Sequence, residues 1–252
     1  MKQITKKYKN FLFNLKRKII IDESLNGKLS LDELFNYYGT DKGSNVKNPY
    51  SEDSSENHGH GFAKFYEKKF SDFKNETFNL LEIGTWEGAS TAAFSNYFIS
   101  SKIYGIDKNF KFKYRSNRVE FNNCDITNKK DLDKFENKFR EKLFKVIIDD
   151  ASHILSHMIF SLNYFFKYLE KGGYFVLEDF NAPKYFPSLN DSNNEEISIG
   201  ELLENIKNKK KFKSKLISSY DQDFLFKNIS KIEVFKGKTE ISDIAFLKRK
   251  LE

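Results

Sequence analysis

Two acidic pairs stand at the ends of short apolar segments in the second half of the chain. Asp149-Asp150 closes the segment FKVIID, and Glu178-Asp179 closes YFVLE, 29 positions further on. That spacing suits a strand, a crossover helix and a parallel strand, whose carboxyl ends line one crevice. Carboxylates gathered there repel one another unless a cation or protons intervene. All-oxygen ligands favour a hard cation, so we expect Mg²⁺ or Mn²⁺, with the alternative that Asp149 or Asp150 only caps a helix.

A histidine follows the first acidic pair. His153 stands three residues after Asp150, on the expected strand-to-helix turn, which directs its ring to the same crevice. Imidazole is the side chain best suited to exchange protons near neutral pH, so His153 is the candidate general base for a hydroxyl activated by a metal. The alternative is a histidine that only stabilises the start of the helix. His157, one turn further on, is expected to be structural.

The segment EIGTWEG, residues 82–88, ends one apolar segment and begins a helical one. Glycines there let the backbone turn and approach a ligand, and a helix N-terminus favours negative charge. The spacing matches neither Gly-x-Gly-x-x-Gly nor a phosphate-binding P-loop. The next strand ends in Asp107, whose carboxylate can accept hydrogen bonds from two ribose hydroxyls. Asp125 follows the third strand, in a position to meet an adenine amino group.

The elements that position these residues alternate between strand and helix. This order predicts an α/β fold of Rossmann-like type, with a doubly wound, mostly parallel, seven-stranded sheet, an antiparallel C-terminal hairpin and an N-terminal helical segment. We expect two regions: 1–74, with a basic arm, helices and a lid loop, and 75–252, the catalytic domain. The expected strands are 78–84, 102–107, 119–123, 144–149, 174–178, 229–235 and 241–247, and the expected helices are 31–38, 88–98, 128–142 and 155–169.

Together, the glycine segment and the strand-terminal acids resemble the class I S-adenosylmethionine-dependent methyltransferases. The resemblance covers about 78–250. It implies that the glycine loop abuts the methionine part of the cofactor, that the acid after the second strand holds the ribose, and that the later acid meets the adenine. By this resemblance these roles fall to Glu82, Gly84, Gly88, Asp107 and Asp125.

A narrower resemblance extends over 31–250. The segments YYGTDKGS, LEIGTWEGAS, IYGIDK, IIDDASH and KGGYFVLED are similar to the metal-dependent macrolide sugar O-methyltransferases, the mycinamicin type. This implies that Asp150, Glu178 and Asp179 bind the metal and that His153 is the base. Ala151 stands where that group usually has Gly, and Phe62 where it has Tyr.

The loop 40–66 is long and polar, and loops of that length in compact domains are often functional. Thr40, Lys42 and His60 are expected to fold over the cofactor as a lid that excludes water. Ser90, in the helix after the glycine segment, and Asp149 complete the predicted cofactor-binding set. A polar surface loop is the alternative, above all for 45–56.

Composition and charge set further bounds. The chain has 252 residues, 27 Phe and 13 Tyr, enough aromatic area for a core, and one Cys, which excludes an internal disulfide. All of the net charge of +7 is accounted for by seven cations among the first 18 residues. This arm has an apolar stripe at helical spacing, which favours an oligomer contact, a membrane-surface contact or packing on its own domain. Without a secretory signal or an apolar run of membrane length, we expect a cytoplasmic protein.

The sequence therefore predicts an enzyme, an S-adenosylmethionine-dependent O-methyltransferase that uses Mg²⁺ or Mn²⁺. The expected acceptor is a sugar hydroxyl on a nucleotide-linked sugar or glycoconjugate, for surface polysaccharide or glycoside biosynthesis. The alternatives are a small non-sugar hydroxyl or amine acceptor, and a non-catalytic cofactor-binding scaffold. Nucleic acid is not an expected partner, because the body of the chain is neutral. A homo-oligomer is expected.

Overall fold

The structure, a computed structural model, describes residues 11–13, 15–46, 59–109, 111–191 and 195–252. Its main sheet has seven strands in the order β5-β3-β2-β6-β7-β9-β8, so the predicted α/β fold is confirmed. The chain divides into two compact units, 1–132 and 133–252, which are described separately below. The boundary predicted after residue 74, between an arm with a lid and a catalytic domain, stays a prediction. No helix within the described residues is long and apolar enough to cross a membrane.

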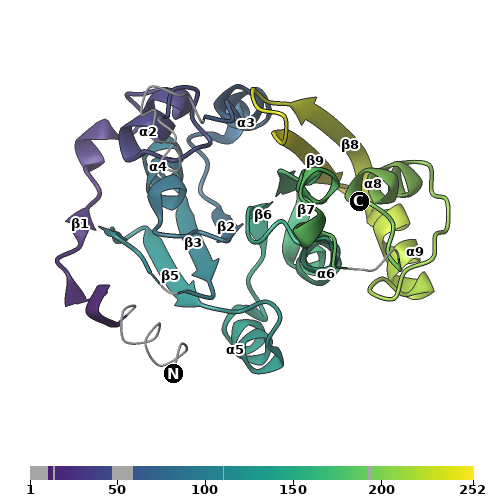
Figure 1. Cartoon of the computed structure of the whole chain (residues 1–252). Helices are drawn as coiled ribbons and strands as arrows, with labels where there is room; N and C mark the ends of the chain where they lie inside the picture. The colour runs from purple at the N-terminus through teal and green to yellow at the C-terminus, as the bar shows by residue number, and fades with distance from the viewer. Residues whose placement is uncertain (1–10, 14, 47–58, 110, 192–194) are drawn as a thin grey trace. The chain divides into compact units, whose positions relative to one another are not determined.

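The first unit contains three parallel strands: β2 (Asn79–Ile83), β3 (Lys102–Asp107) and β5 (Val119–Asn123). The helix α4 (Ala89–Tyr97) connects β2 to β3 (Figure 1). The sequence predicted all four elements within one or two residues. Strands β2 and β3 are almost wholly buried, as their continuous apolar runs require in a sheet covered on both faces.

Two helices, α2 (Leu31–Tyr38) and α3 (Ala63–Phe70), pack beside α4. Ser30 and Glu33 form a capping box at the start of α2, and Gly39, with φ 72°, ends the helix in the left-handed conformation. Ring contacts hold the three helices together: Phe94 of α4 lies 5.3 Å from Phe35 and 5.4 Å from Tyr66, centroid to centroid. The abundance of phenylalanine in the sequence thus serves the core.

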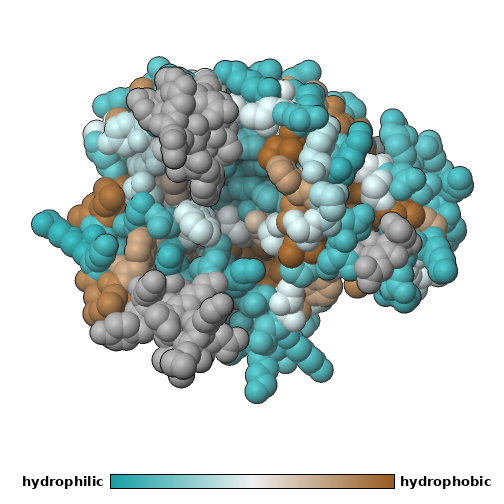
Figure 2. Space-filling view, in the orientation of Figure 1, coloured by the Kyte–Doolittle hydropathy of each residue, from teal (hydrophilic) through white to brown (hydrophobic). Residues whose placement is uncertain are grey.

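A small second sheet joins β1 (Ile19–Ile20) to β4 (Tyr114–Arg115) in parallel. This pairing was not predicted, because two-residue strands carry no periodicity. The side chain of Ile20 is 74% exposed, and Figure 2 shows hydrophobic atoms at the lower left, where Figure 1 draws this part of the chain. Of the predicted amphipathic arm, residues 1–10 lie outside the described residues, and 11–13 are helical.

The second unit contains β6 (Phe144–Asp149) and β7 (Leu169–Glu178), which are parallel, and β9 (Asp243–Arg249) and β8 (Ile229–Lys236), which follow in antiparallel order. The predicted C-terminal hairpin is confirmed. β7 starts five residues earlier than predicted, with a register shift against β6. Gly173 allows this close approach, because a Cβ there would lie 2.6 Å from the Lys145 carbonyl oxygen.

The helices of this unit are α5 (Lys129–Phe139), which begins before the boundary between the units, α6 (Leu155–Phe165), α7 (Ala182–Tyr185), α8 (Ile199–Lys207) and α9 (Ser219–Asn228). Short 3-10 turns complete the chain: η1 (Glu23–Leu25), η2 (Ser71–Phe73), η3 (Phe166–Tyr168) and η4 (Pro187–Leu189). Helices α5 and α6 were predicted from the sequence, whereas α8 and α9 were not. Capping boxes at Ser198 and Ser218 start these two helices, and that Ser-x-x-acid pattern was a readable signal.

Candidate functional site

The glycine loop of the first unit connects β2 to α4. Gly84 and Gly88 adopt φ values of 87° and 89°, which only glycine adopts without strain. Gly84 N–H donates to the Ile106 carbonyl at 2.9 Å, and Gly88 N–H closes a turn on Thr85 O at 2.8 Å. α4 then starts without a side-chain cap, in contrast to α2, α8 and α9. Its first N–H groups therefore suit a polar or anionic ligand group.

Packing imposes a second requirement on Gly88. A Cβ built there would lie 2.5 Å from the Phe121 ring atom Cζ, and one at Gly105 would lie 2.8 Å from Cδ1 of the same ring. The loop therefore needs glycine for close packing on Phe121 as well as for its positive φ. From the sequence, only the tight turn and the approach to a ligand could be given as reasons for glycine here.

Glu82, in β2, is fully buried and is surrounded by partners from the same unit. It accepts hydrogen bonds from Ser90 Oγ and Thr91 Oγ1, both at 2.5 Å, and Lys42 Nζ lies 4.0 Å from its Oε1. The hydroxyls come from the first turn of α4, so the carboxylate fixes the helix start against the strand. Glu82, Ser90 and Lys42, predicted as separate cofactor contacts, thus form one buried cluster that positions the glycine loop.

Asp107 ends β3 and is half-buried. Its carboxylate accepts hydrogen bonds from Trp86 N at 3.0 Å and Asn109 N at 2.6 Å, which holds it beside the glycine loop. Asp125 also holds local backbone, because its Oδ1 accepts from the N–H and the hydroxyl of Thr127. Asp107 therefore lies beside the glycine loop that the cofactor prediction concerns, whereas Asp125 stabilises the turn that leads to α5.

The ends of the predicted lid loop pack against each other. His60 N donates to Asp41 O, and Phe62 N donates to Lys42 O at 2.9 Å, so 41–43 and 60–62 run side by side. Thr40, Lys42 and His60 are all buried. The middle of the loop, 47–58, lies outside the described residues, so the lid itself stays a prediction. Phe62 is fully enclosed in the core.

In the second unit, the ends of β6 and β7 bring three predicted site residues together. Asp150, His153 and Asp179 each offer a ligand atom within 4.8 Å of the other two. His153 Nε2 lies 3.6 Å from Asp150 Oδ1. His153 and Asp179 adopt left-handed φ values of 54° and 47°. Such strain, of about 1–3 kcal/mol per residue, is typical of functional sites, where the surrounding structure holds the residue in place.

The other member of each acidic pair lies elsewhere. Asp149 and Glu178 are buried, and among the described residues neither belongs to the three-residue cluster. Asp150 and Asp179 lie just beyond the strand ends, and Asp179 leaves the extended conformation with φ 47°, so alternation within the strands does not decide which acids meet. Asp149 Oδ1 accepts from Ala151 N at 3.3 Å, whereas Oδ2 is buried without a hydrogen-bond partner among the described residues. Burial raises the pKa of Asp149 to about 6.

The two carboxylates of the cluster fit a small hard cation, whereas an imidazole nitrogen is a ligand for softer ions such as Zn²⁺. Two carboxylates and one imidazole, with ligand atoms within 4.8 Å of one another, form part of a coordination sphere of oxygen and nitrogen. Mg²⁺ commonly keeps several waters and takes only one or two protein carboxylates, which suits a half-open site. Asp150 and His153 are partly exposed, so the cluster is accessible. His157 Nδ1 is 2.8 Å from Ser152 Oγ, a contact that supports the turn.

Two further features near these sites were not among the predicted ones. Trp86, the one tryptophan of the chain, is 63% exposed with φ 49° in the glycine loop. Its position between Thr85 and Glu87, in a motif already singled out, was a usable signal. The second feature is the segment after Phe180, which forms α7 and leads to α8; Pro183 near the start of α7 indicated that helix.

Fold and glycine loop together define the class: a Rossmann-like domain of the methyltransferase type. A family model described as FtsJ-like methyltransferase matches residues 64–193, which is just over half of the chain. The chain therefore belongs to the FtsJ-like methyltransferase family.

Curated proteins of similar sequence give a more specific comparison than the family model. The chain is 30% identical over 127 residues to mycinamicin VI 2''-O-methyltransferase of Micromonospora griseorubida, covering 48% of this chain and 31% of that protein. It is 28% identical over 178 residues to L-olivosyl-oleandolide 3-O-methyltransferase of Streptomyces antibioticus, covering 67% and 42%. For the first of these proteins and for three further curated O-methyltransferases, the match spans about a third of the relative's length.

A solved structure shows the same fold. The MycE methyltransferase from the mycinamycin biosynthetic pathway, in complex with Mg and SAH, superposes with a TM-score of 0.64 at 23% identity. The similarity covers 88% of this chain and 55% of that one. At this identity the comparison establishes the architecture.

Proposed function

We propose that this protein transfers a methyl group from S-adenosylmethionine to a sugar hydroxyl with the help of a divalent cation. The observation that carries the proposal is the cluster of Asp150, His153 and Asp179, with two of its three residues held in strained backbone. Membership in a methyltransferase family supports the transfer, and the curated relatives named above, which act on sugar-bearing molecules by their names, support the acceptor class.

In the first unit we propose that the loop from Gly84 to Gly88 and the N-terminus of α4 bind the methionine part of the cofactor, and that Asp107 binds its ribose. Glu82, Ser90 and Lys42 would keep this loop in place through their buried contacts. Asp125 remains the proposed residue for the adenine, with Thr40 and His60 as further proposed contacts; Asp149, which belongs to the second unit, is also a proposed cofactor contact. Bound S-adenosylmethionine would supply an activated methyl group on a sulfonium.

In the second unit, Asp150 and Asp179 would hold Mg²⁺, with Glu178 as a further proposed ligand. Bound Mg²⁺ would lower the pKa of an acceptor hydroxyl and fix its orientation. His153 would then accept the hydroxyl proton at Nε2 as the oxygen forms its bond to the methyl carbon and the carbon–sulfur bond breaks. The products are a methyl ether, S-adenosylhomocysteine and a protonated imidazole, which loses its proton to solvent.

The cluster also supports a second role for His153. Its Nε2 lies among the possible ligand atoms, 3.6 Å from Asp150 Oδ1, so the imidazole suits a metal ligand as well as a base. A non-catalytic scaffold is less well supported, because such a scaffold has no need of a histidine beside acids in strained conformations. A small non-sugar acceptor remains the alternative within the enzyme class.

Calorimetry and mass spectrometry together test the proposal. Titration with S-adenosylhomocysteine should show one site per chain, and Asp107→Ala should weaken that binding. Incubation with S-adenosylmethionine and a panel of nucleotide sugars and glycosides should give a product heavier by one methylene. Chelation should abolish that product and added Mg²⁺ should restore it. Absence of cofactor binding in the wild type would overturn the proposal; turnover that survives chelation would remove the metal from it.

We further propose a cytoplasmic setting in the biosynthesis of a polysaccharide or glycoside, with self-association through the N-terminal arm. Phe11, Leu15, Ile19 and Ile20 all expose more than half of their side-chain surface, beside the cations 16–18. Exposed apolar residues in a row typically mark an interface. Deletion of 1–20 should lower the mass measured by light scattering. An unchanged mass together with lost liposome binding would instead establish a membrane contact.

A further inference from the structure

A surface that is both aromatic and basic lies in the first unit, beside the glycine loop. Three ammonium groups surround the ring of Phe13: the Nζ atoms of Lys16, Lys18 and Lys111 lie 5.8, 5.7 and 5.6 Å from its centroid. Lys111 Nζ also lies 6.0 Å from the centroid of the Trp86 ring. Lys111 therefore joins Phe13 to the glycine loop, and we call these five residues the basic aromatic surface.

The positive charge of this surface is only partly compensated by the chain. Among the described residues, neither Lys16 nor Lys111 forms an ion pair with a carboxylate. Lys113, two positions after Lys111, differs from both, because its ammonium group pairs with the Glu87 carboxylate. Ammonium groups gathered around one ring repel one another, so an anion placed among them would be attracted by all of them.

Backbone and ring contacts attach the surface to the fold. Lys113 N–H donates to the Glu87 carbonyl oxygen at 2.8 Å, which holds the segment 111–113 beside the glycine loop. Lys18 Nζ donates to the Phe112 carbonyl oxygen at 2.7 Å, and the Phe112 ring stacks on Phe121 of β5 at 4.8 Å, centroid to centroid. The cations around Phe13 therefore lie at a defined place relative to the sheet of this unit.

Trp86 presents a large aromatic face to solvent at the edge of this surface. Its side chain is 63% exposed, while its backbone N–H donates to the Asp107 carboxylate at 3.0 Å. Bases stack on aromatic side chains whatever their identity, because every base has a π face. An exposed indole beside ammonium groups therefore matches a ligand that joins an aromatic base to phosphate groups.

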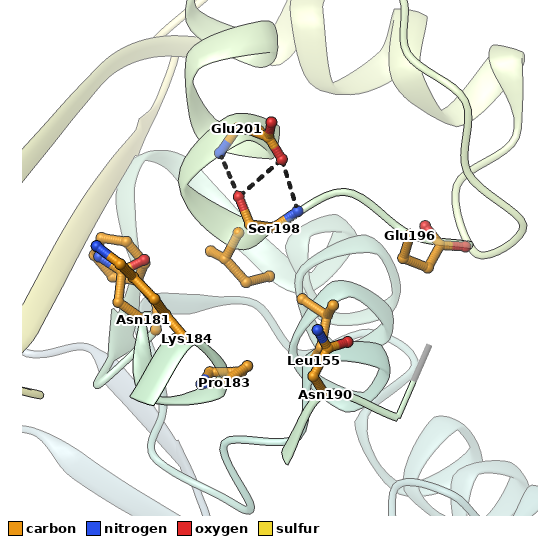
Figure 3. A pocket seen from close by; sticks show the side chains of 10 residues that line it. Leu155, Asn181, Pro183, Lys184, Asn190, Glu196, Ser198 and Glu201 are labelled. Atoms are coloured by element: carbon orange, nitrogen blue, oxygen red, sulfur yellow. Dashed lines mark hydrogen bonds between the residues drawn. The ribbon is translucent and has the colours of Figure 1, made fainter. Parts of the chain in front are cut away.

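A cavity of about 290 Å³ in the second unit, between α6, α7 and α8, is a poorer match for such a ligand (Figure 3). Of its described lining residues, Lys184 is the one cation. The Glu201 carboxylate, which also lines the cavity, binds Ser198 in the capping box of α8 and would repel a phosphate. Phe180 is buried and offers no open stacking face.

We propose that the basic aromatic surface binds the nucleoside diphosphate of a nucleotide-linked sugar acceptor, with the base stacked on Trp86 and the phosphates beside Lys16, Lys18 and Lys111. This inference rests on the proposed function and adds a binding site for the part of the acceptor that is not methylated. Lysine suits the role, because its ammonium group binds phosphate as a point charge. The site lies on the unit that carries the proposed cofactor loop.

Fluorescence of Trp86 tests the inference, because it is the one tryptophan of the chain. The protein is titrated with UDP, dTDP, GDP and CDP, with and without saturating S-adenosylhomocysteine, and with the corresponding nucleosides and inorganic diphosphate as partial ligands. The matched variants are Lys111→Gln and Lys64→Gln. Lys64 is an exposed lysine of the same unit whose Nζ also lies over a ring, 4.8 Å from the centroid of Phe65.

At least one nucleoside diphosphate should quench the fluorescence and bind more tightly than its nucleoside or diphosphate alone. Lys111→Gln should weaken binding by about tenfold, as expected for the loss of a hydrogen bond between charged groups, and Lys64→Gln by less than twofold. Added salt should weaken binding by screening the charges. By calorimetry, Trp86→Leu should lose affinity by about fivefold or more, and Trp86→Phe, which keeps a stacking face, should lose less.

Four outcomes would overturn the inference: no nucleotide binds, the two lysine variants bind equally well, S-adenosylhomocysteine displaces the nucleotide, or phosphatidylglycerol vesicles bind through Lys111 while nucleotides do not. The proposed function fails separately. If S-adenosylhomocysteine does not bind while a nucleotide still depends on Lys111, the nucleotide site stands without the methyl transfer. If methyl transfer to a glycoside proceeds and no nucleotide binds, the transfer stands and this site assignment is wrong.

Discussion

Two buried carboxylates, one in each unit, lie in contrasting surroundings. Glu82 in β2 accepts two hydroxyl hydrogen bonds and has the Lys42 ammonium 4.0 Å away. Asp149, at the end of β6, accepts from one backbone N–H at 3.3 Å, and the nearby Ser161 hydroxyl and His153 only partly offset the effect of its burial. The fold alone satisfies the first carboxylate, whereas burial raises the pKa of the second to about 6.

This difference indicates that the site around the glycine loop is preorganised by the fold, whereas the site at the ends of β6 and β7 is completed by a bound ligand. Around the glycine loop, polar groups of the chain satisfy one another and fix the loop. At the ends of β6 and β7, Asp150 and Asp179 gather with His153, and two of these three residues are strained, an arrangement that an added cation would stabilise. Substitutions in the buried cluster around Glu82 should therefore act on folding, and those in the cluster of Asp150, His153 and Asp179 on catalysis and on ion binding.

The largest effect is expected for His153. Because asparagine tolerates a left-handed φ, His153→Asn keeps the backbone while removing the imidazole. Turnover at saturating acceptor should fall by about 10²–10⁴-fold, with S-adenosylhomocysteine affinity unchanged. His157→Asn is the matched control and should cost far less. Full turnover of His153→Asn combined with weaker Mg²⁺ binding would make His153 a ligand and contradict its role as the base.

The next effect concerns Glu82. Glu82→Leu leaves Lys42 buried without its carboxylate and deprives Ser90 and Thr91 of their acceptor. Breaking a buried pair in this way costs about 3–5 kcal/mol in the free energy of unfolding, which urea titration measures. A loss below about 1 kcal/mol would contradict the claim that this cluster is organised in advance.

Removing the charge of Asp149 should raise the free energy of unfolding, whereas removing that of Glu82 lowers it. The measurement uses protein stripped of divalent cations. The folded-state pKa of Asp149 is about 6, against an ordinary value of 3.8. Between these values the folded state holds a proton that the unfolded state has lost, so stability falls as pH rises from about 4 to about 6. Asp149→Asn should flatten this dependence and raise the free energy of unfolding at neutral pH by up to about 3 kcal/mol. An unchanged pH profile in Asp149→Asn would show that other groups cause it.

The smallest effect separates two glycines with similar φ. Gly39→Ala places its Cβ in open space, so only the left-handed backbone costs energy, about 1 kcal/mol. Gly88→Ala adds a collision with Phe121 and should cost about 2 kcal/mol. The double variant Gly88→Ala, Phe121→Leu should recover the difference in thermal melts. Equal losses for the two glycine variants would show that Phe121 moves aside freely.

The elements were predictable where a pattern was strong. Continuous apolar runs gave β2, β3 and β6, and the hairpin β8–β9 followed from its central turn. The pairing of β1 with β4 was not predictable, because two-residue strands are defined by their partner alone. β7 starts earlier than predicted because its glycines allow a close approach to β6, which only the packed sheet reveals.

The sequence by itself determined that acids, glycines and a histidine stand at strand ends, since strand periodicity and turn chemistry are local properties. Only the tertiary structure decided which acid of each pair joins His153. Asp150 and Asp179 do so, whereas Asp149 and Glu178 do not, because the backbone leaves the extended conformation just past the strand ends, with φ 47° at Asp179 and φ 54° at His153. It also decided that Lys42 partners Glu82, 40 positions away, because packing brings distant segments together where local pattern carries no information.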